Sequence, residues 1–261
     1  MSIAMFDTPY RVVILLFAFM LGGVMASFFT CMGSRMAEGR DWVRERSRCE
    51  SCGHELGPLD LIPVFFYLFS GGRCRYCKAK IPVICLLSEI GLGLYYVLVV
   101  LKFGLSAETF RCMGLAGLLL GLSVVDMKIY EIPDEFIIAG IILWAVTVPF
   151  VSVPWQEELV RGLAGGFGIG GGMLVLSLIF DRILKKDSLG GGDIKLFFMT
   201  GLYLGLWCGL FNLIVSCLVG LVFVIILKKT KIPFGPSISI AVMFSLLYGM
   251  DVVRWYLDLF L

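Results

Sequence analysis

Long apolar runs separated by short polar intervals dominate the pattern of this chain. Averaging the hydropathy over a window of roughly 19 residues, about the length of a helix that crosses a bilayer, identifies the individual runs. Polar and charged residues gather in the intervals, above all in the one that follows the first run. The pattern predicts an all-α polytopic membrane protein with about eight transmembrane helices, near 12–33, 82–101, 108–125, 133–153, 159–180, 194–207, 208–227 and 234–250.

The stretch from Ile194 to Leu227 has two interpretations. It is 34 residues long and contains Gly201, Gly205 and Gly209, so it could form two short helices or one long bent helix. The two interpretations differ by one in the number of helices that they predict.

Composition agrees with a membrane protein. Hydrophobic residues make up 59% of the chain, charged residues make up 16%, and the mean hydropathy is +0.94, which excludes an ordinary soluble domain. The net charge is +2, and the basic residues fall in short loops rather than in one stripe or tail, so no nucleic-acid partner is expected. The first apolar run, from Val12 to Cys31, is too long for a signal-peptide core and follows no basic segment, so we expect a retained helix.

The basic residues predict the orientation of the helices. With the N-terminus outside, the intervals 35–81, 126–132, 182–195 and 228–232 face the cytosol, and they hold 17 of the 22 Lys and Arg residues. Cytosolic loops of membrane proteins carry such an excess. The expected domains are a first transmembrane helix at 1–34, a cytosolic loop at 35–81 and a transmembrane domain at 82–261.

Four cysteines in the first cytosolic interval form two pairs. The pair Cys49 and Cys52 is separated by 21 residues from the pair Cys74 and Cys77, and Arg or Lys lies beside each. Repeated C-x2-C pairs are typical of a closed tetrahedral zinc site, and nearby cations favour the thiolates that bind the metal. Two disulfides are the alternative, which a reducing cytosol disfavours. We therefore expect these four cysteines to hold a structural Zn²⁺ ion.

The remaining cysteines and the single histidine are given no ligand role. His54 lies near the first pair, but four thiols already complete a tetrahedral site, so it is expected to be a solvated loop residue. Isolated cysteines in apolar helices ordinarily pack as small hydrophobic residues. This applies to Cys31, Cys85, Cys112, Cys208 and Cys217.

Two aspartates stand at the ends of apolar segments. Asp126 closes one segment, and Asp193 opens another directly after Gly190, Gly191 and Gly192. Two carboxyl groups brought together at a membrane boundary do not easily both ionise, so one can hold a proton while the other activates water. The glycines would let a substrate backbone approach and would allow backbone angles closed to other residues. The pair predicts aspartic-protease chemistry, whereas either aspartate alone is more typical of a solvated helix end.

The glycine turn resembles the G-x-G-D-x-K-L motif of type IV prepilin peptidases, and other blocks of that family recur in the same order. The resemblance spans almost the whole chain. The blocks are Gly23 to Ser27-Phe28 followed by Arg35, the two cysteine pairs, Asp126 with Ile132-Pro133-Asp134, Gly190 to Leu196, and Ile232-Pro233-Phe234-Gly235-Pro236.

This resemblance implies a bifunctional enzyme of the bacterial inner membrane. Asp126 and Asp193 would be the catalytic pair of an aspartic endopeptidase that cuts the short basic leader from type IV prepilins or pseudopilins on the cytosolic side. Cleavage would follow a glycine, commonly before a phenylalanine. Members with the cysteine loop also methylate the new N-terminal amine with S-adenosylmethionine, so the same is expected here.

Residues beside the aspartates have roles that the sequence leaves open. Asp134 begins a helix, where a carboxylate suits the free N–H groups and the positive dipole end, so a structural role is favoured over catalysis. Lys195 could interact with Asp193, contact substrate, or be an ordinary lysine at the membrane surface. Lys195 and Gly190–Gly192 are the candidate substrate-binding residues.

The methyl-donor site is not identified by sequence. Glu89 and Gly72 are the candidate cofactor-binding residues. Glu89, within the second helix, could pair with a basic loop residue, face a polar cavity near the active site, or simply reach for the membrane interface.

Two other classes of protein stay open. A presenilin-like intramembrane protease also uses a G-x-G-D turn, but the Pro-Ala-Leu element of that family is absent here and Ile232-Pro233-Phe234-Gly235-Pro236 stands in its place. A zinc-binding transporter or scaffold would explain the many helices and the metal loop, but no inverted repeats or mid-helix carboxylate chains mark an ion path.

Overall fold

The computed structural model describes residues 3, 7–57, 60, 62–185, 189–228 and 232–259. Within these ranges the protein is helical, and its only β-type pairings are two isolated bridges. The prediction of an all-α protein is confirmed. Contacts divide the chain into two compact units, Met1–Leu105 and Ser106–Leu261.

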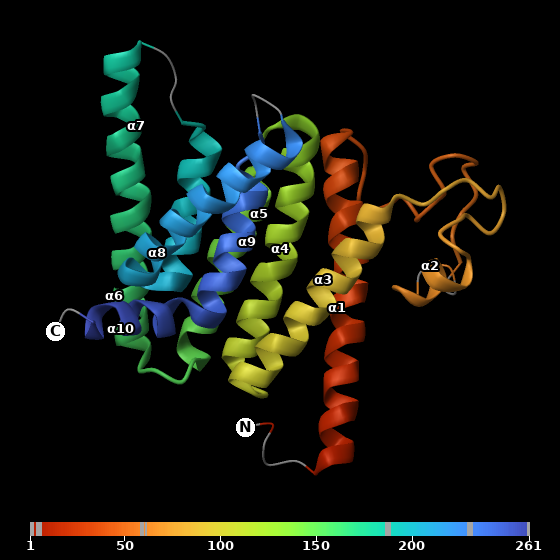
Figure 1. Ribbon diagram of the computed structural model, residues 1–261, viewed down its shortest axis with the longest axis horizontal. Coiled ribbons are helices and arrows are strands. Elements are labelled where there is room, and N and C mark those ends of the chain that lie inside the picture. The colour runs from red at the N-terminus through yellow and green to blue at the C-terminus, as the bar shows by residue number, and fades with distance from the viewer. Residues whose placement is uncertain are drawn as a thin grey trace. The chain divides into compact units, whose positions relative to one another are not determined.

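Two long helices lie side by side in the first unit (Figure 1). The helices are α1 (Thr8–Ala37) and α3 (Val83–Phe103), and the interval between them contains the short helix α2 (Phe65–Phe69). A Cβ on Gly22 of α1 would lie 2.6 Å from Cα of Gly93 in α3, so small residues permit this close approach of the backbones. Helix α3 therefore belongs to the same unit as α1.

Arg35 ties the polar interval to the end of α1. Its buried guanidinium donates to the carbonyl oxygens of Glu45 at 2.6 Å and Arg46 at 2.9 Å. Such charge-assisted hydrogen bonds are stronger than neutral ones. The arginine of the first-helix motif therefore acts as an anchor for the loop that follows it.

The second unit is a helical bundle with α4 in its interior. The hydroxyl of Ser106 caps α4 by accepting the N–H of Thr109, and α4 packs against α5 and α9. A hydrogen bond of 2.9 Å from Ser123 to Ser239 links α4 to α9. The elements are α4 (Ala107–Ile129), α5 (Asp134–Thr147), α6 (Trp155–Gly165), α7 (Gly171–Leu184), α8 (Gly191–Leu227), α9 (Gly235–Phe244) and α10 (Met250–Asp258).

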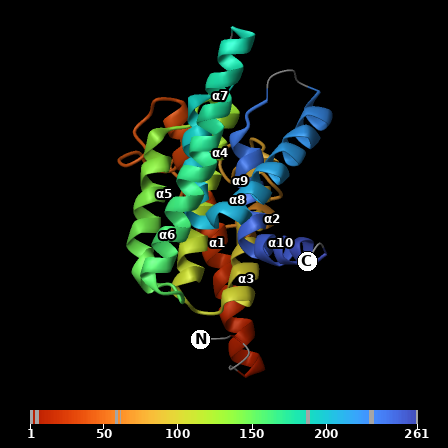
Figure 2. The same cartoon turned by 90° about the vertical axis from the view of Figure 1, so that its left-hand side faces the viewer.

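Helix α8 has a break in its middle. Gly205 has φ 72° and ψ −177°, which lies outside the helical range and is accessible to glycine. A straight helix of this length would separate its ends by about 55 Å. Residues 190–193 and 232–234, which precede and follow α8, nevertheless line one cleft. The helix therefore doubles back at Gly205 (Figures 1 and 2).

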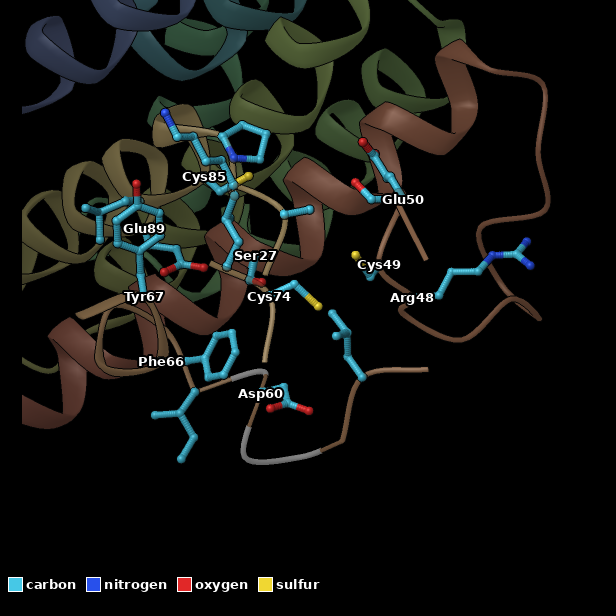
Figure 3. A pocket seen from close by; sticks show the side chains of 18 residues that line it. Ser27, Arg48, Cys49, Glu50, Asp60, Phe66, Tyr67, Cys74, Cys85 and Glu89 are labelled. Atoms are coloured by element: carbon cyan, nitrogen blue, oxygen red, sulfur yellow. The ribbon is translucent and has the colours of Figure 1, made fainter. Parts of the chain in front are cut away.

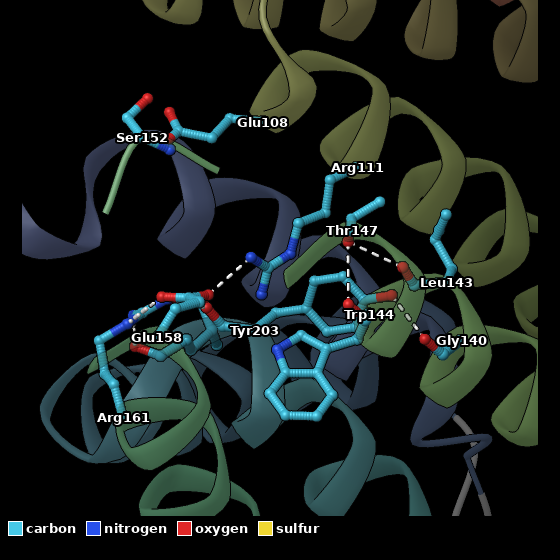
Figure 4. A network of polar contacts seen from close by, with 11 residues as sticks. Glu108, Arg111, Gly140, Leu143, Trp144, Thr147, Ser152, Glu158, Arg161 and Tyr203 are labelled. Atoms are coloured by element: carbon cyan, nitrogen blue, oxygen red, sulfur yellow. Dashed lines mark hydrogen bonds and ion pairs between the residues drawn. The ribbon is translucent and has the colours of Figure 1, made fainter. Parts of the chain in front are cut away.

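A network of ion pairs that includes the buried side chains of Arg111 and Glu158 supports this break (Figure 4). Arg161 of α6 donates to the carbonyl oxygens of Tyr203 and Leu204, both at 3.1 Å, just before Gly205. Glu158 accepts from Arg161 at 2.8 Å and from Arg111 of α4 at 2.6 Å. Carbonyl groups released by a helix break in a membrane need replacement donors. The network supplies them and joins α4, α6 and α8.

The described residues contain six helices long and apolar enough to cross a membrane, rather than eight. The count is two lower than expected because the two arms of α8 on either side of Gly205 form one continuous span, and because α5 has only 14 residues before a short 3₁₀ turn at Val148–Phe150. The segments expected at 194–207 and 208–227 correspond to the two arms of α8. The six candidates are α1, α3, α4, α6 with α7, α8, and α9 with α10. They identify a multi-pass membrane protein.

Candidate active site and metal centre

Asp126 and Asp193 come together in a cleft of the second unit. Asp126 lies in the last turn of α4 and is only 4% exposed, whereas Asp193 lies in the first turn of α8. Both line a cleft of about 880 Å³, and their carboxyl groups are close enough to interact electrostatically. Packing of the bundle thus creates a pair of acids that is open to a ligand.

The backbone of a third segment fixes one of these acids. The N–H of Gly235, at the start of α9, donates to Oδ2 of Asp126 at 2.7 Å. A Cβ on Gly235 would lie 2.7 Å from the same oxygen and would displace the carboxylate. Sequence analysis placed Gly235 in a motif but gave it no role, because the contact spans 109 positions of the chain.

The turn Gly190–Gly192 before Asp193 needs glycines at both ends because side chains there would crowd neighbouring groups. A Cβ on Gly190 would lie 3.0 Å from Oδ2 of Asp193, and one on Gly192 would lie 2.9 Å from Cβ of Ile132. The expectation of unusual backbone angles was wrong, since none of the three glycines has a positive φ and Gly190 has φ −65°. The turn is an ordinary start of a helix, and all three glycines line the cleft.

Lys195 pairs with Asp134 at the rim of the cleft. Its Nζ donates to Oδ1 at 2.7 Å and to Oδ2 at 2.9 Å, and both side chains are more than half exposed. Asp134 lies in the first turn of α5, as expected, but makes no side-chain capping bond there. The lysine charge is therefore directed to Asp134 rather than to Asp193.

The four cysteines form a cluster in the first unit, as the spacing predicts. Their Sγ atoms all lie within 4.8 Å of one another, and those of Cys49 and Cys77 are 3.8 Å apart. Tetrahedral zinc with Zn–S bonds of about 2.3 Å requires S–S separations of about 3.8 Å. The thiol donor set and its spacing fit a zinc ion.

The two halves of the cluster have the same backbone geometry. The N–H of Cys49 donates to the carbonyl of His54, and the N–H of Cys74 donates to that of Ala79, each five positions later. Isolated antiparallel bridges close both turns. Each half is therefore a knuckle whose shape is set by local hydrogen bonds.

The thiols interact electrostatically. Hydrogen bonds from backbone groups, first that of Cys52, lower the pKa of Cys49 to about 7. At Cys77 the N–H of Ala79 acts in the same direction, but burial and the other three thiols outweigh it and raise the pKa to about 11. Ionisation of one thiol therefore disfavours ionisation of its neighbours, and a bound cation would offset this repulsion. His54 is not in the cluster; its ring lies 3.6 Å from that of Tyr76.

Two family models match this chain, one within each of the two units. Residues 20–103 match the Bacterial Peptidase A24 N-terminal domain, and residues 113–225 match the Type IV leader peptidase family. A protein of Aeromonas hydrophila named prepilin leader peptidase/N-methyltransferase is 32% identical over 227 residues, which is 83% of this chain and 76% of that protein. The chain belongs to the type IV leader peptidase family.

Other relatives in the family carry the same name. The Bacillus subtilis protein is 27% identical over 249 residues, covering 92% of this chain and 97% of its own length. The Pseudomonas aeruginosa protein is 30% identical over 228 residues, covering 83% and 76%. No solved structure gives a significant match. Membership of the type IV leader peptidase family favours a peptidase over the transporter, scaffold and presenilin-like alternatives.

In this member of the type IV leader peptidase family, Glu89 lines a cavity of about 310 Å³ in the first unit (Figure 3). It also lines an adjoining cavity of about 650 Å³. Its Oε2 accepts the N–H of Val64 at 2.7 Å. Val64 has φ 62°, a strained angle for a β-branched residue, so Glu89 holds a strained turn just before α2. The structure supports the cavity alternative for Glu89.

Gly72, the other candidate, makes room for an aromatic ring. It has φ 68°, and a Cβ there would lie 2.8 Å from Cζ of Tyr67. Tyr67 lines the smaller cavity, whereas Gly72 lies behind it and lines neither cavity. Gly72 therefore acts on the cavity through Tyr67.

Proposed function

We propose that this protein removes the leader of type IV prepilin-like proteins with the Asp126–Asp193 pair and then methylates the new N-terminal amine. The observation that carries the peptidase half is the meeting of the two aspartates in one cleft. Family membership and the names of the relatives support both halves.

The pair would carry out hydrolysis by general acid–base catalysis. One aspartate takes a proton from water, which attacks the scissile carbonyl carbon, while the other gives a proton to the departing amine nitrogen. The hydrogen bond from Gly235 holds Asp126 in a fixed orientation. The protons belong to the pair, so either aspartate can begin the cycle as the acid.

Substrates would be type IV prepilins, or the pseudopilins of secretion and competence systems. The peptide would extend through the cleft past Gly190, Gly191 and Gly192, where missing side chains leave room for its backbone. Lys195, which lines the cleft and binds Asp134, would also contact the substrate. The leader would be cut after glycine, commonly before phenylalanine.

The first unit would carry methyl transfer. S-adenosylmethionine supplies an electrophilic methyl group when bound. Cys49, Cys52, Cys74 and Cys77 would hold a structural zinc ion, because four thiolates close the coordination sphere and leave no position for a substrate. Zinc would therefore stabilise the loop without taking part in hydrolysis.

The protein would lie in the bacterial inner membrane with its N-terminus outside. The excess of Lys and Arg in the intervals 35–81 and 182–195 supports a cytosolic location for the cysteine loop and the glycine turn. Cleavage and methylation would then both occur on the cytosolic side.

Incubation of the purified full-length protein with a prepilin peptide tests the proposal. The peptide has a basic leader, a Gly-Phe junction and the start of the apolar helix, and mass spectrometry follows the products. We expect a single cut at the junction and, with S-adenosylmethionine present, a gain of one methyl group by the product. Absence of cleavage by zinc-replete protein in lipid would refute the peptidase assignment.

A further inference from the structure

We propose that the smaller cavity of the first unit binds the methyl donor through Asp60, and that Glu89 receives the amine of the cleaved peptide. This inference rests on the proposed N-methylation. It concerns the 310 Å³ cavity and the wall that it shares with the larger cavity (Figure 3).

Asp60 presents a buried oxygen that lacks a hydrogen-bond donor. The residue is 7% exposed and lines the smaller cavity. Its Oδ2 accepts the N–H of Gly57 at 3.1 Å, whereas Oδ1 has no hydrogen-bond partner among the described residues; Nη1 of Arg75 is 3.9 Å away. A buried carboxylate oxygen without a donor is costly, which points to a ligand that supplies one. Ribose hydroxyls are donors that acidic residues commonly bind.

The rest of the smaller cavity suits an adenosyl sulfonium compound. Apolar side chains of Phe66, Ile81 and Leu86 offer surface for a purine ring, and its volume lies in the range of small-molecule sites. Figure 3 shows Asp60, Tyr67 and Glu89 around the same space. An aromatic ring and a carboxylate both attract the positive sulfonium group. The cavity thus offers a place for each part of the donor.

Glu89 lies where donor and peptide would meet, because it lines both cavities. The larger cavity carries hydroxyl groups from both long helices, including Thr30, Ser34 and Ser88, and could admit a polar peptide end. One oxygen of Glu89 is held by the N–H of Val64. The carboxylate also accepts from the hydroxyl of Ser27, which lines both cavities. A carboxylate has about four acceptor sites, so Glu89 can in addition receive the positively charged N-terminus of the cleaved peptide.

The transfer balances with these groups. The peptide ammonium gives a proton to the Glu89 carboxylate and becomes a neutral amine. Its nitrogen lone pair forms the new bond to the methyl carbon while the carbon–sulfur bond breaks, and that electron pair stays on sulfur as a neutral thioether. The methylated amine leaves as an ammonium ion, and Glu89 returns its proton to water.

The donor half is tested by calorimetric binding of S-adenosylhomocysteine to the zinc-replete full-length protein. Asp60→Asn keeps an acceptor for Gly57 but replaces the free acceptor with a donor, so binding should weaken about tenfold or more. Glu55→Gln is the matched control, since this exposed acid of the same unit lines neither cavity. It should bind within about twofold of wild type, because exposed ion pairs contribute little.

A second measurement uses the wild-type protein, in case Asp60→Asn loses zinc. Cys85 lines both cavities, whereas Cys31 lines the larger cavity and a third, neighbouring one but not the smaller cavity. S-adenosylhomocysteine should slow the alkylation of Cys85 more than that of Cys31, as measured by peptide mass spectrometry. Equal protection of the two thiols would place the ligand elsewhere and overturn the assignment.

The acceptor half is tested by binding of mature peptides with a free or an acetylated N-terminal Phe. Wild type should bind the free amine about tenfold more tightly, and Glu89→Gln, which keeps an acceptor for Val64, should lose that preference. A loss of fold alone would weaken both peptides equally. A retained preference would overturn the role of Glu89.

The outcomes separate this inference from the proposed function. If wild type methylates the mature peptide while Asp60→Asn binds S-adenosylhomocysteine normally, the site is wrong and the methyltransferase stands. If wild type neither binds the donor nor transfers a methyl group, the proposed methylation fails and this inference fails with it.

Discussion

The cysteine cluster and the aspartate cleft are built in different ways. Each cysteine knuckle is closed by hydrogen bonds between residues five positions apart, so its shape is local. The aspartates come from α4 and α8, and Asp126 is held by the start of α9. Each half of the cysteine cluster therefore depends on a local turn, whereas the acid pair exists only when distant segments pack together.

This difference has energetic consequences. Metal binding and folding are coupled in a thiolate site, because the ligands are brought together by the same loop that the ion stabilises. Replacing a cleft carboxyl group with an amide removes chemistry while keeping shape. We therefore expect the two sites to respond oppositely to substitution: one loses structure and the other loses activity.

Substitution of the aspartates should give the largest effect. Asp126→Asn and Asp193→Asn should each lower cleavage of a prepilin peptide by about 10³-fold or more, because the two groups act as one unit. Zinc content and membrane insertion should stay at wild-type values. Asp134→Asn is the control in the same cleft and should retain most activity. Near-normal cleavage by either single variant would remove that aspartate from the catalytic pair.

Substitution of the cysteines should produce the opposite pattern. The wild-type protein should contain about one zinc per chain, and Cys49→Ser or Cys77→Ser should release it, since each removes a ligand. Cys217→Ser, a change of an exposed thiol outside the cluster, should keep the metal. Cleavage should fall less than methyl transfer. Metal analysis that finds no zinc in wild-type protein would defeat the account of this site.

Gly235→Ala tests how far the acid pair depends on the start of α9, whose backbone N–H binds Asp126. The new Cβ would lie 2.7 Å from Oδ2 of Asp126, so the carboxylate must shift. We expect kcat for leader cleavage to fall about 10- to 100-fold, as small displacements of catalytic groups cost this much.

Gly171→Ala is the matched control for that substitution. A Cβ at this helical glycine meets nothing within 4 Å, so activity should not change. Wild-type kcat in Gly235→Ala would mean that the hydrogen bond to Asp126 is not needed for catalysis.

The smallest effect is expected at the rim. Lys195→Gln removes an ion pair whose partners are both more than half exposed, and such pairs contribute little free energy. The kcat should change less than about fivefold, with any loss expressed mainly in KM. A loss as large as that of the aspartate variants would give Lys195 a catalytic role.

Local patterns and tertiary contacts differ in what sequence can predict. The cysteine spacing correctly predicts that the four thiols lie together, and both knuckles are closed within a few residues. Hydropathy predicts a helical membrane protein and both arms of α8, but a window of residues does not show that the chain doubles back at Gly205. The contacts of Gly235 with Asp126 and of Lys195 with Asp134 join distant segments and have no local signal.

Separation of the two activities is the most direct test of the central claim that each unit carries its own chemistry. Purified Asp193→Asn protein is incubated with labelled S-adenosylmethionine and either a full-length prepilin or a mature peptide with N-terminal Phe. The account predicts label in the mature peptide at close to the wild-type rate and none in the uncut prepilin, because only cleavage exposes the amine. Failure of the variant to label the mature peptide, under conditions where wild type labels it and both proteins hold zinc, would contradict the account.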